Sequence, residues 1–226
     1  MNDDLNPLAG LRRNPSGRPL LGLTVLMVED SRFASEAMRL MCQRSGARLR
    51  RADCLRSARR HLQSYRPTVA IIDLGLPDGS GEELIAELAA ARPRLPAILA
   101  TSGDPAGEAS ARAAGADGFL PKPFDSLTRF QSLVLARLGA FGPRGVVAEG
   151  APLFPDRLAL RDDLVSAADA LRGEGDAIYL SRFLAGLARS AGDAPLERAA
   201  QDYAASRDPA PIARLISDRL AGTRPF

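Results

Sequence analysis

The 226-residue chain has one His, two Cys and a single Lys. Such a small set of soft ligands leaves little material for a structural zinc site. Cys42 and Cys54 form neither a CxxC pair nor a disulfide framework, which is typical of a protein in the reducing cytoplasm. No run of 18 apolar residues is present, and the acidic start Met1–Leu5 lacks the basic and apolar regions of a signal peptide. We therefore expect a cytoplasmic protein that does not associate with membranes.

The scarcity of lysine makes one position stand out. Of the 30 basic residues, 29 are Arg, and the only Lys is Lys122, within Phe119–Phe124. Lys carries a compact point charge on a thin stem, whereas Arg presents a wide planar fork that suits two acceptors at once. A position that keeps Lys in such a chain is a candidate for contact with one anionic oxygen in a narrow pocket.

Hydrophobic patterning indicates an α/β domain in the first part of the chain. Short apolar runs typical of buried strands occur at 24–28, 69–72, 97–100 and 118–120, and an alternating segment at 47–51 suits a sheet edge. Segments with helical spacing lie between and after them, at 33–42, 55–65, 82–91, 107–114 and 127–138. This alternation predicts a flavodoxin-like, doubly wound, five-stranded parallel sheet with strand order 2-1-3-4-5.

The remainder of the chain has a helical period throughout. Apolar stripes predict four short amphipathic helices: 157–171, one around 180–187, one after Asp193–Pro195, and 212–220. Helices of this kind should pack as a small all-α bundle. The predicted organisation is a disordered leader at 1–21, the α/β domain at 22–140, a linker at 141–155 and the helical bundle domain at 156–226.

Polar residues follow the predicted strands at the points where they end. Glu29 and Asp30 follow the first strand, Asp73 the third, Thr101 the fourth and Lys122 the fifth. Because binding groups collect at the carboxyl ends of a doubly wound sheet, we expect these side chains in one pocket. Three neighbouring carboxylates repel unless a proton or cation intervenes, and oxygen ligands suit Mg²⁺. The layout would neutralise an anion attached to Asp73, with metal on one side and the ammonium and hydroxyl on the other.

These residues resemble a known family. Glu29–Asp30, Asp73–Gly81, Thr101–Ser102 and Lys122–Pro123 together are similar to the receiver domain of bacterial two-component response regulators, over about residues 22–140. The resemblance implies that Asp73 accepts a phosphoryl group from a histidine kinase or a histidine phosphotransfer protein. The protein would thus be a phosphoacceptor and not an enzyme, with self-catalysed phosphorylation and dephosphorylation as its only chemistry.

The resemblance also implies roles for individual residues. Asp30 and Asp73 would bind Mg²⁺ directly, with the Gly75 carbonyl as a third protein ligand and Glu29 acting largely through water. Lys122 would pair with the phosphoryl group, and the peptide bond to Pro123 is often cis in this family. Thr101 would move toward the phosphoryl group after transfer.

Two further positions bear on that switch. Phe119 falls at the position of a switching aromatic ring, although it could equally fill core volume. Gly75 and Gly103 replace residues that are often bulkier or polar in the family and that tune the access of water to the phosphoryl group.

Three readings of the helical domain compete. The first is a module for contact with a downstream protein partner or for self-dimerisation, arranged like a phosphotransfer bundle without its His. The second is a helix-turn-helix that binds DNA, with a recognition helix at 212–220 offering Arg214 and Arg219 but also Asp218. The third, an enzyme output domain, has no visible metal-ligand cluster, nucleotide loop or nucleophile–base pair. Residues 151–226 hold 10 Arg and 11 acidic residues, a balance that favours protein contact over nucleic acid.

Overall fold

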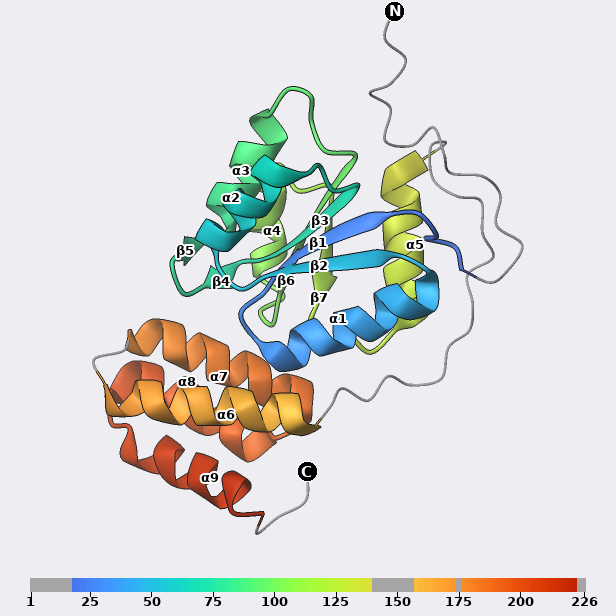
Figure 1. Cartoon of the computed structure of the whole chain (residues 1–226). Coiled ribbons are helices and arrows are strands. Elements are labelled where there is room, and N and C mark those ends of the chain that lie inside the picture. The colour runs from blue at the N-terminus through green and yellow to red at the C-terminus, as the bar shows by residue number, and fades with distance from the viewer. Residues whose placement is uncertain (1–17, 140–156, 174–175, 223–226) are drawn as a thin grey trace, which may run out of the picture.

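Figure 1 shows the chain as a computed structural model in which an α/β domain is followed by a helical bundle. The structure describes residues 18–139, 157–173 and 176–222. The predicted linker at 141–155 and most of the predicted leader at 1–21 lie outside these ranges. Among the described residues, no helix combines the length and the apolar character that crossing a membrane requires.

The α/β domain is built on a five-stranded parallel sheet with the order β2-β1-β3-β6-β7. The strands are β1 (Thr24–Val28), β2 (Arg48–Ala52), β3 (Val69–Asp73), β6 (Ala97–Ser102) and β7 (Gly118–Pro121). The predicted flavodoxin-like order is therefore confirmed, and the alternating segment forms the edge strand. A two-stranded antiparallel hairpin, β4 (Gly75–Leu76) and β5 (Gly79–Ser80), was not predicted, because two-residue strands carry no periodicity.

Each strand sends alternate side chains into two cores, one on each face of the sheet. On β1, Val25 and Met27 pack with the helices of one face, and Leu26 and Val28 pack with those of the other. Helices α1 (Arg32–Ser45) and α5 (Leu127–Leu138) cover the first face. Helices α2 (Leu55–Ser64), α3 (Gly81–Ala90) and α4 (Gly107–Ala113) cover the second. Coverage on both faces explains why the central strands are apolar without interruption.

The α/β domain begins earlier than residue 22. The Leu20 amide donates a hydrogen bond to the Ser45 carbonyl at 2.9 Å, and the Leu20 side chain is fully buried in the core beside α1 and α5. The predicted leader is therefore wrong at its end. Burial of one leucine side chain contributes about 2 kcal/mol, which favours the contact of this short segment with the domain.

The second domain contains all four predicted helices, with ends that differ from the expected ones by at most a few residues. They are α6 (Arg157–Arg172), α7 (Ala177–Ala191), α8 (Ala194–Ser206) and α9 (Ala210–Leu220). Their apolar stripes form one core that includes Leu164, Leu184 and Ile216. Asp193 caps α8 by accepting a hydrogen bond from the Leu196 amide at 3.1 Å. Figure 1 shows this bundle packed beside the start of α1, below the sheet.

Candidate functional site

The carboxyl ends of the central strands bring three acidic side chains together. Glu29 and Asp30 follow β1, and Asp73 ends β3, which pairs with β1 on one side and with β6 on the other. Each of the three carboxylates offers an oxygen that lies within 4.8 Å of the others. Glu29 is fully buried and Asp73 is only 6% exposed. The clustering that the strand ends predict is thus present.

Lys122 lies inside this cluster. Its Nζ is 2.6 Å from Glu29 Oε2 and 3.0 Å from Asp73 Oδ2, and its side chain is 9% exposed. The Lys122 amide donates to the Ser102 carbonyl at 2.9 Å, which ties the residue to the end of β6. The Lys122–Pro123 peptide is cis, as the family resemblance implied. The only lysine of the chain therefore contacts one oxygen of each of two buried carboxylates.

The electrostatics of the pocket favour an additional positive charge. Burial raises the pKa of Glu29 and of Asp73, and the attraction of Lys122 offsets this effect only in part. Burial alone would lower the pKa of Lys122, but the charges of Asp73 and Glu29 outweigh it and raise the pKa above its usual range. One ammonium thus faces three carboxylates. A hard divalent cation with oxygen ligands, such as Mg²⁺, fits this excess of negative charge and this donor set.

Asp30 completes the acidic cluster, and both of its carboxylate oxygens accept hydrogen bonds. The Ser31 amide donates to Asp30 Oδ1 at 3.0 Å and to Glu29 Oε1 at 3.1 Å. The hydroxyl of Tyr179, on α7 of the helical bundle, donates to Asp30 Oδ2. Burial and then the charge of Asp30 raise the pKa of Tyr179, which keeps the phenol protonated as a donor.

Thr101 and Gly75 lie beside the cluster. Thr101 pairs with Asp73 in the sheet and is fully buried, and its hydroxyl donates to the Leu120 carbonyl at 2.6 Å. A carbonyl of the neighbouring strand thus accepts the hydroxyl in this structure, and the movement of Thr101 toward a phosphoryl group stays a prediction. Gly75 opens β4, and its backbone amide donates to the Asp73 carboxylate. The role of its carbonyl as a metal ligand stays a prediction.

Phe119 lies on β7 with 8% of its surface exposed, in the core shared by α2, α3 and α4. This position is compatible with both readings of the residue, as a core side chain and as a switching ring. Its switch role remains a prediction.

The sequence reasoning missed two residues of the site, and both come from the helical bundle. Tyr179 contacts Asp30 across 149 residues of sequence, and Asp163 on α6 accepts a hydrogen bond from the Ser31 hydroxyl across 132. Neither residue belongs to a motif. The only signal in the sequence was an acidic residue among the apolar positions of the expected helix at 157–171, where Asp163 precedes Leu164. In the structure this residue is buried.

Comparison with known proteins agrees with this geometry. Residues 25–133 match the family model described as the response regulator receiver domain. These residues form a receiver domain. The match contains the acidic cluster, Asp73, Thr101 and Lys122, and it ends before the helical bundle begins.

Individual relatives cover the same share of the chain. The virulence transcriptional regulatory protein PhoP of Salmonella typhimurium is 31% identical over 121 residues, which are 52% of this chain and 54% of PhoP. The chain spans about half the length of the curated relatives it matches.

Two solved structures illustrate the likeness. The chemotaxis response regulator CheY4 of Vibrio cholerae is 25% identical with a TM-score of 0.44, covering 50% of this chain and 98% of its own. A receiver domain of a histidine kinase from Syntrophus aciditrophicus is also 25% identical, with a TM-score of 0.47 and coverage of 51% and 89%.

Proposed function

We propose that this protein is a response regulator in which Asp73 accepts a phosphoryl group from a histidine kinase or histidine phosphotransfer protein. One observation carries the proposal: Lys122 Nζ lies between Asp73 Oδ2 and Glu29 Oε2 in a buried pocket that also contains Asp30. An ion pair buried this deeply has little value for stability alone, because desolvation offsets much of the attraction. Its position at the carboxyl ends of the strands is where a doubly wound sheet places its ligands.

The pocket can promote transfer through charge and position. Phosphoryl transfer passes through a loose transition state, so positioning and neutralisation of charge supply most of the catalysis. An Asp73 carboxylate oxygen forms the new bond to phosphorus while the bond between phosphorus and the donor nitrogen breaks. The Lys122 ammonium then has a phosphoryl oxygen as a partner. Mg²⁺, held by Asp30 and Asp73 with Glu29 and the Gly75 carbonyl in support, would supply the second positive charge.

Chemical phosphorylation tests this proposal directly. Incubation with acetyl phosphate and Mg²⁺ should add about one phosphoryl group per chain. Mass spectrometry should show this addition as a gain of about 80 Da. Asp73→Asn should abolish the gain. Asp202→Asn, which changes an exposed carboxylate on α8, is the matched control and should leave it intact. Equal labelling of the wild type and Asp73→Asn would refute the proposal.

For the output we propose control of a protein contact, either with a downstream partner or between two copies of the chain. The main support is that Arg219 forms an ion pair within the bundle. Arg219 is one of the two arginines that a DNA-binding α9 would need. Its guanidinium lies 2.7 Å from Asp193 Oδ2, and the two side chains are 9% and 4% exposed. Arg219 therefore stabilises the bundle, and α9 retains Arg214 beside Asp218 for any contact with phosphates.

Transcriptional control through DNA is the second candidate. It is favoured by the name of the PhoP relatives, which are transcriptional regulatory proteins, and by the short turn at 207–209 between α8 and α9. Two measurements separate the candidates: mass in solution with and without beryllofluoride, and binding to random DNA at several salt concentrations. A change of mass without DNA binding supports protein contact. Tight binding that falls steeply with salt supports the DNA reading.

A further inference from the structure

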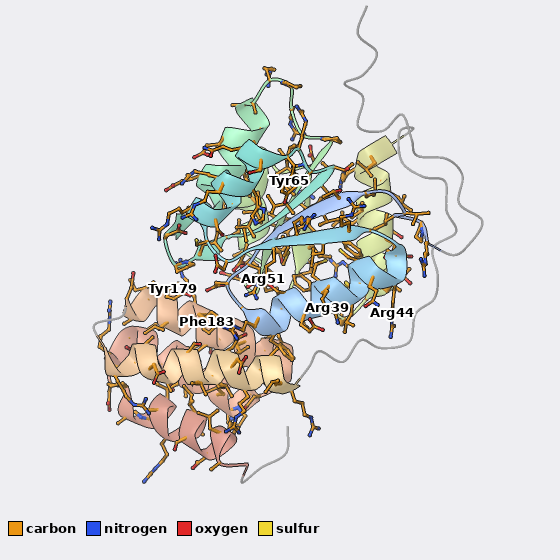
Figure 2. The ribbon with its side chains drawn as sticks, in the orientation of Figure 1. Arg39, Arg44, Arg51, Tyr65, Tyr179 and Phe183 are labelled. Carbon is orange, nitrogen blue, oxygen red and sulfur yellow. The ribbon has the colours of Figure 1, made fainter. Side chains whose placement is uncertain are left out.

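The helical bundle packs directly against the phosphoacceptor pocket. The Tyr179 hydroxyl, from the first turn of α7, donates to Asp30 Oδ2, one of the carboxylate oxygens of the predicted metal site. Figure 2 shows Tyr179 and Phe183 along the side of the bundle that faces the receiver domain. An oxygen that accepts this hydrogen bond is not free to coordinate a cation in the same geometry. The contact therefore involves the chemistry of the site itself.

A second contact joins α6 to the start of α1. The Asp163 carboxylate accepts hydrogen bonds from the Arg32 amide at 3.0 Å, the Phe33 amide at 3.0 Å and the Ser31 hydroxyl at 2.9 Å. The first amides of a helix have no partner within the helix, and a carboxylate there also benefits from the helix dipole. Asp163 is 3% exposed, so α6 adds a buried carboxylate to the start of α1, which Ser31 also caps.

Two more features show close packing between the domains. Phe33, on α1, is 6% exposed and belongs to the core of the bundle, which also contains Leu160 and Leu164. At Gly103, in the loop after β6, a Cβ atom would lie 3.2 Å from Arg189 Nη1 and 3.4 Å from the Gly186 Cα on α7. A side chain larger than a methyl group at Gly103 would therefore crowd α7 and Arg189.

A surface cleft beside the site reaches Asp30. This cleft of about 1130 Å³ has Asp30, Arg51 and Asp78 in its lining, together with Ala159 from α6. Asp73 does not line this cleft. The docked bundle thus contributes a wall of the cleft, while the phosphoacceptor stays buried.

We propose that the α6–α7 face of the bundle is an intramolecular partner of the phosphoacceptor face, and that Tyr179 holds the Asp30 oxygen that a metal ion must take. This inference rests on the proposed function. It adds a competition between a cation at Asp30 and the Tyr179 hydroxyl of the docked α7 for the same carboxylate oxygen. Linkage then requires the reverse effect, so that metal binding and phosphorylation release the bundle and free its α6–α7 face for a protein partner.

Metal affinity of the unphosphorylated full chain tests the competition. Tyr179→Phe removes the hydroxyl and should tighten Mg²⁺ binding about tenfold, because a hydrogen bond to a charged group is lost only from the docked state. Tyr65→Phe is the matched control, since the Tyr65 hydroxyl is buried without a hydrogen-bond partner among the described residues. Calorimetric titration with Mg²⁺ should show a change in the first variant alone. Equal affinities in the wild type and both variants would overturn the proposal.

Hydrogen exchange tests the release. The Arg32 and Phe33 amides are protected by Asp163 in the docked state, so beryllofluoride with Mg²⁺ should speed their exchange at least tenfold. Gly103→Leu, which crowds α7, should speed it without any ligand. Unchanged protection in both cases would contradict the release of the bundle.

The two levels of the proposal fail separately. If acetyl phosphate labels the wild type at Asp73 but Tyr179→Phe leaves Mg²⁺ affinity unchanged, the proposed competition between Tyr179 and the metal ion is wrong. The proposed function then still stands. If neither the wild type nor Gly103→Leu is labelled, the proposed function itself is wrong, whatever the metal affinities.

Discussion

Lys122 Nζ lies 3.0 Å from Asp73 Oδ2, in a pocket that leaves only 9% of the lysine side chain exposed. This buried contact gives the prediction for Lys122→Arg. The wider guanidinium keeps the charge but cannot contact single oxygens in the same geometry. We expect the variant to retain chemical phosphorylation at a reduced rate and to lose the accelerated exchange of the α1 amides that accompanies beryllofluoride.

The control for this variant exchanges the same two residue types at the surface. Arg137→Lys changes an exposed residue of α5 and should behave as the wild type. Normal phosphorylation-dependent exchange in Lys122→Arg would mean that any cation serves at this position.

A second prediction concerns the free energy of unfolding without metal. Burial raises the pKa of Asp73, and the nearby charge of Asp30 raises it further, so the ionised carboxylate is destabilising in the folded state. Asp73→Asn should therefore raise the free energy of unfolding by about 1 kcal/mol in metal-free buffer at neutral pH. Urea unfolding followed by circular dichroism measures the difference.

Added Mg²⁺ provides the internal control. The ion stabilises only a folded state that binds it, so millimolar Mg²⁺ should stabilise the wild type more than Asp73→Asn. The difference in unfolding free energy between the two proteins should therefore become smaller. A variant that is less stable than the wild type in metal-free buffer would show that the Lys122–Asp73 attraction outweighs the cost of burying the charge.

Much of this site could be predicted from the sequence because its residues follow strands whose apolar runs are unambiguous. Asp73 and Lys122 each lie within two residues of a predicted strand end, so the sheet order alone brings them together. The contacts of Tyr179 and Asp163 could not be predicted, since they depend on how two domains dock and the connecting segment carries no pattern. Leu20 was missed for a related reason: a single buried leucine in a stretch rich in Pro and Gly has no period.

A third prediction concerns Gly81, the first residue of α3. A Cβ atom at this position would lie 2.0 Å from the Asp73 carbonyl oxygen and 2.9 Å from the Leu74 Cα. Backbone atoms cannot move aside as a flexible side chain can, so Gly81→Ala should displace the end of β3 and with it Asp73, the proposed phosphoacceptor. We expect a loss of about 3 kcal/mol in the free energy of unfolding, together with slower labelling by acetyl phosphate.

Gly75→Ala is the matched control for that change. A Cβ atom at Gly75 would meet no atom within 4 Å, and the substitution keeps the backbone carbonyl that is predicted to bind metal. It should cost far less stability than Gly81→Ala. Similar losses in the two variants would show that the close approach of Gly81 to Asp73 is relieved by a small shift of α3.

The last prediction tests the ion pair that stabilises the bundle. Asp193 accepts hydrogen bonds from Arg219 at 2.7 and 3.0 Å and also caps α8, so Asp193→Ala leaves a guanidinium without its partner and α8 without its cap. The expected loss in the free energy of unfolding is about 3 kcal/mol. Asp193→Asn keeps a capping oxygen and should lose less, and Asp202→Ala on the exposed side of α8 should lose almost nothing.

The pH dependence of this pair follows from the direction of its pKa shift. Burial would raise the pKa of Asp193, but the hydrogen bonds from Arg219 and Leu196 outweigh it and lower the pKa. A carboxyl whose pKa is lower in the folded state stabilises the fold above its unfolded pKa, and this contribution disappears as the pH falls through the folded value. The difference in unfolding free energy between the wild type and Asp193→Asn should thus be constant near neutral pH and shrink below roughly pH 4. A difference that stays constant from pH 7 to about pH 3 would mean that the ionised form of Asp193 contributes nothing to the bundle.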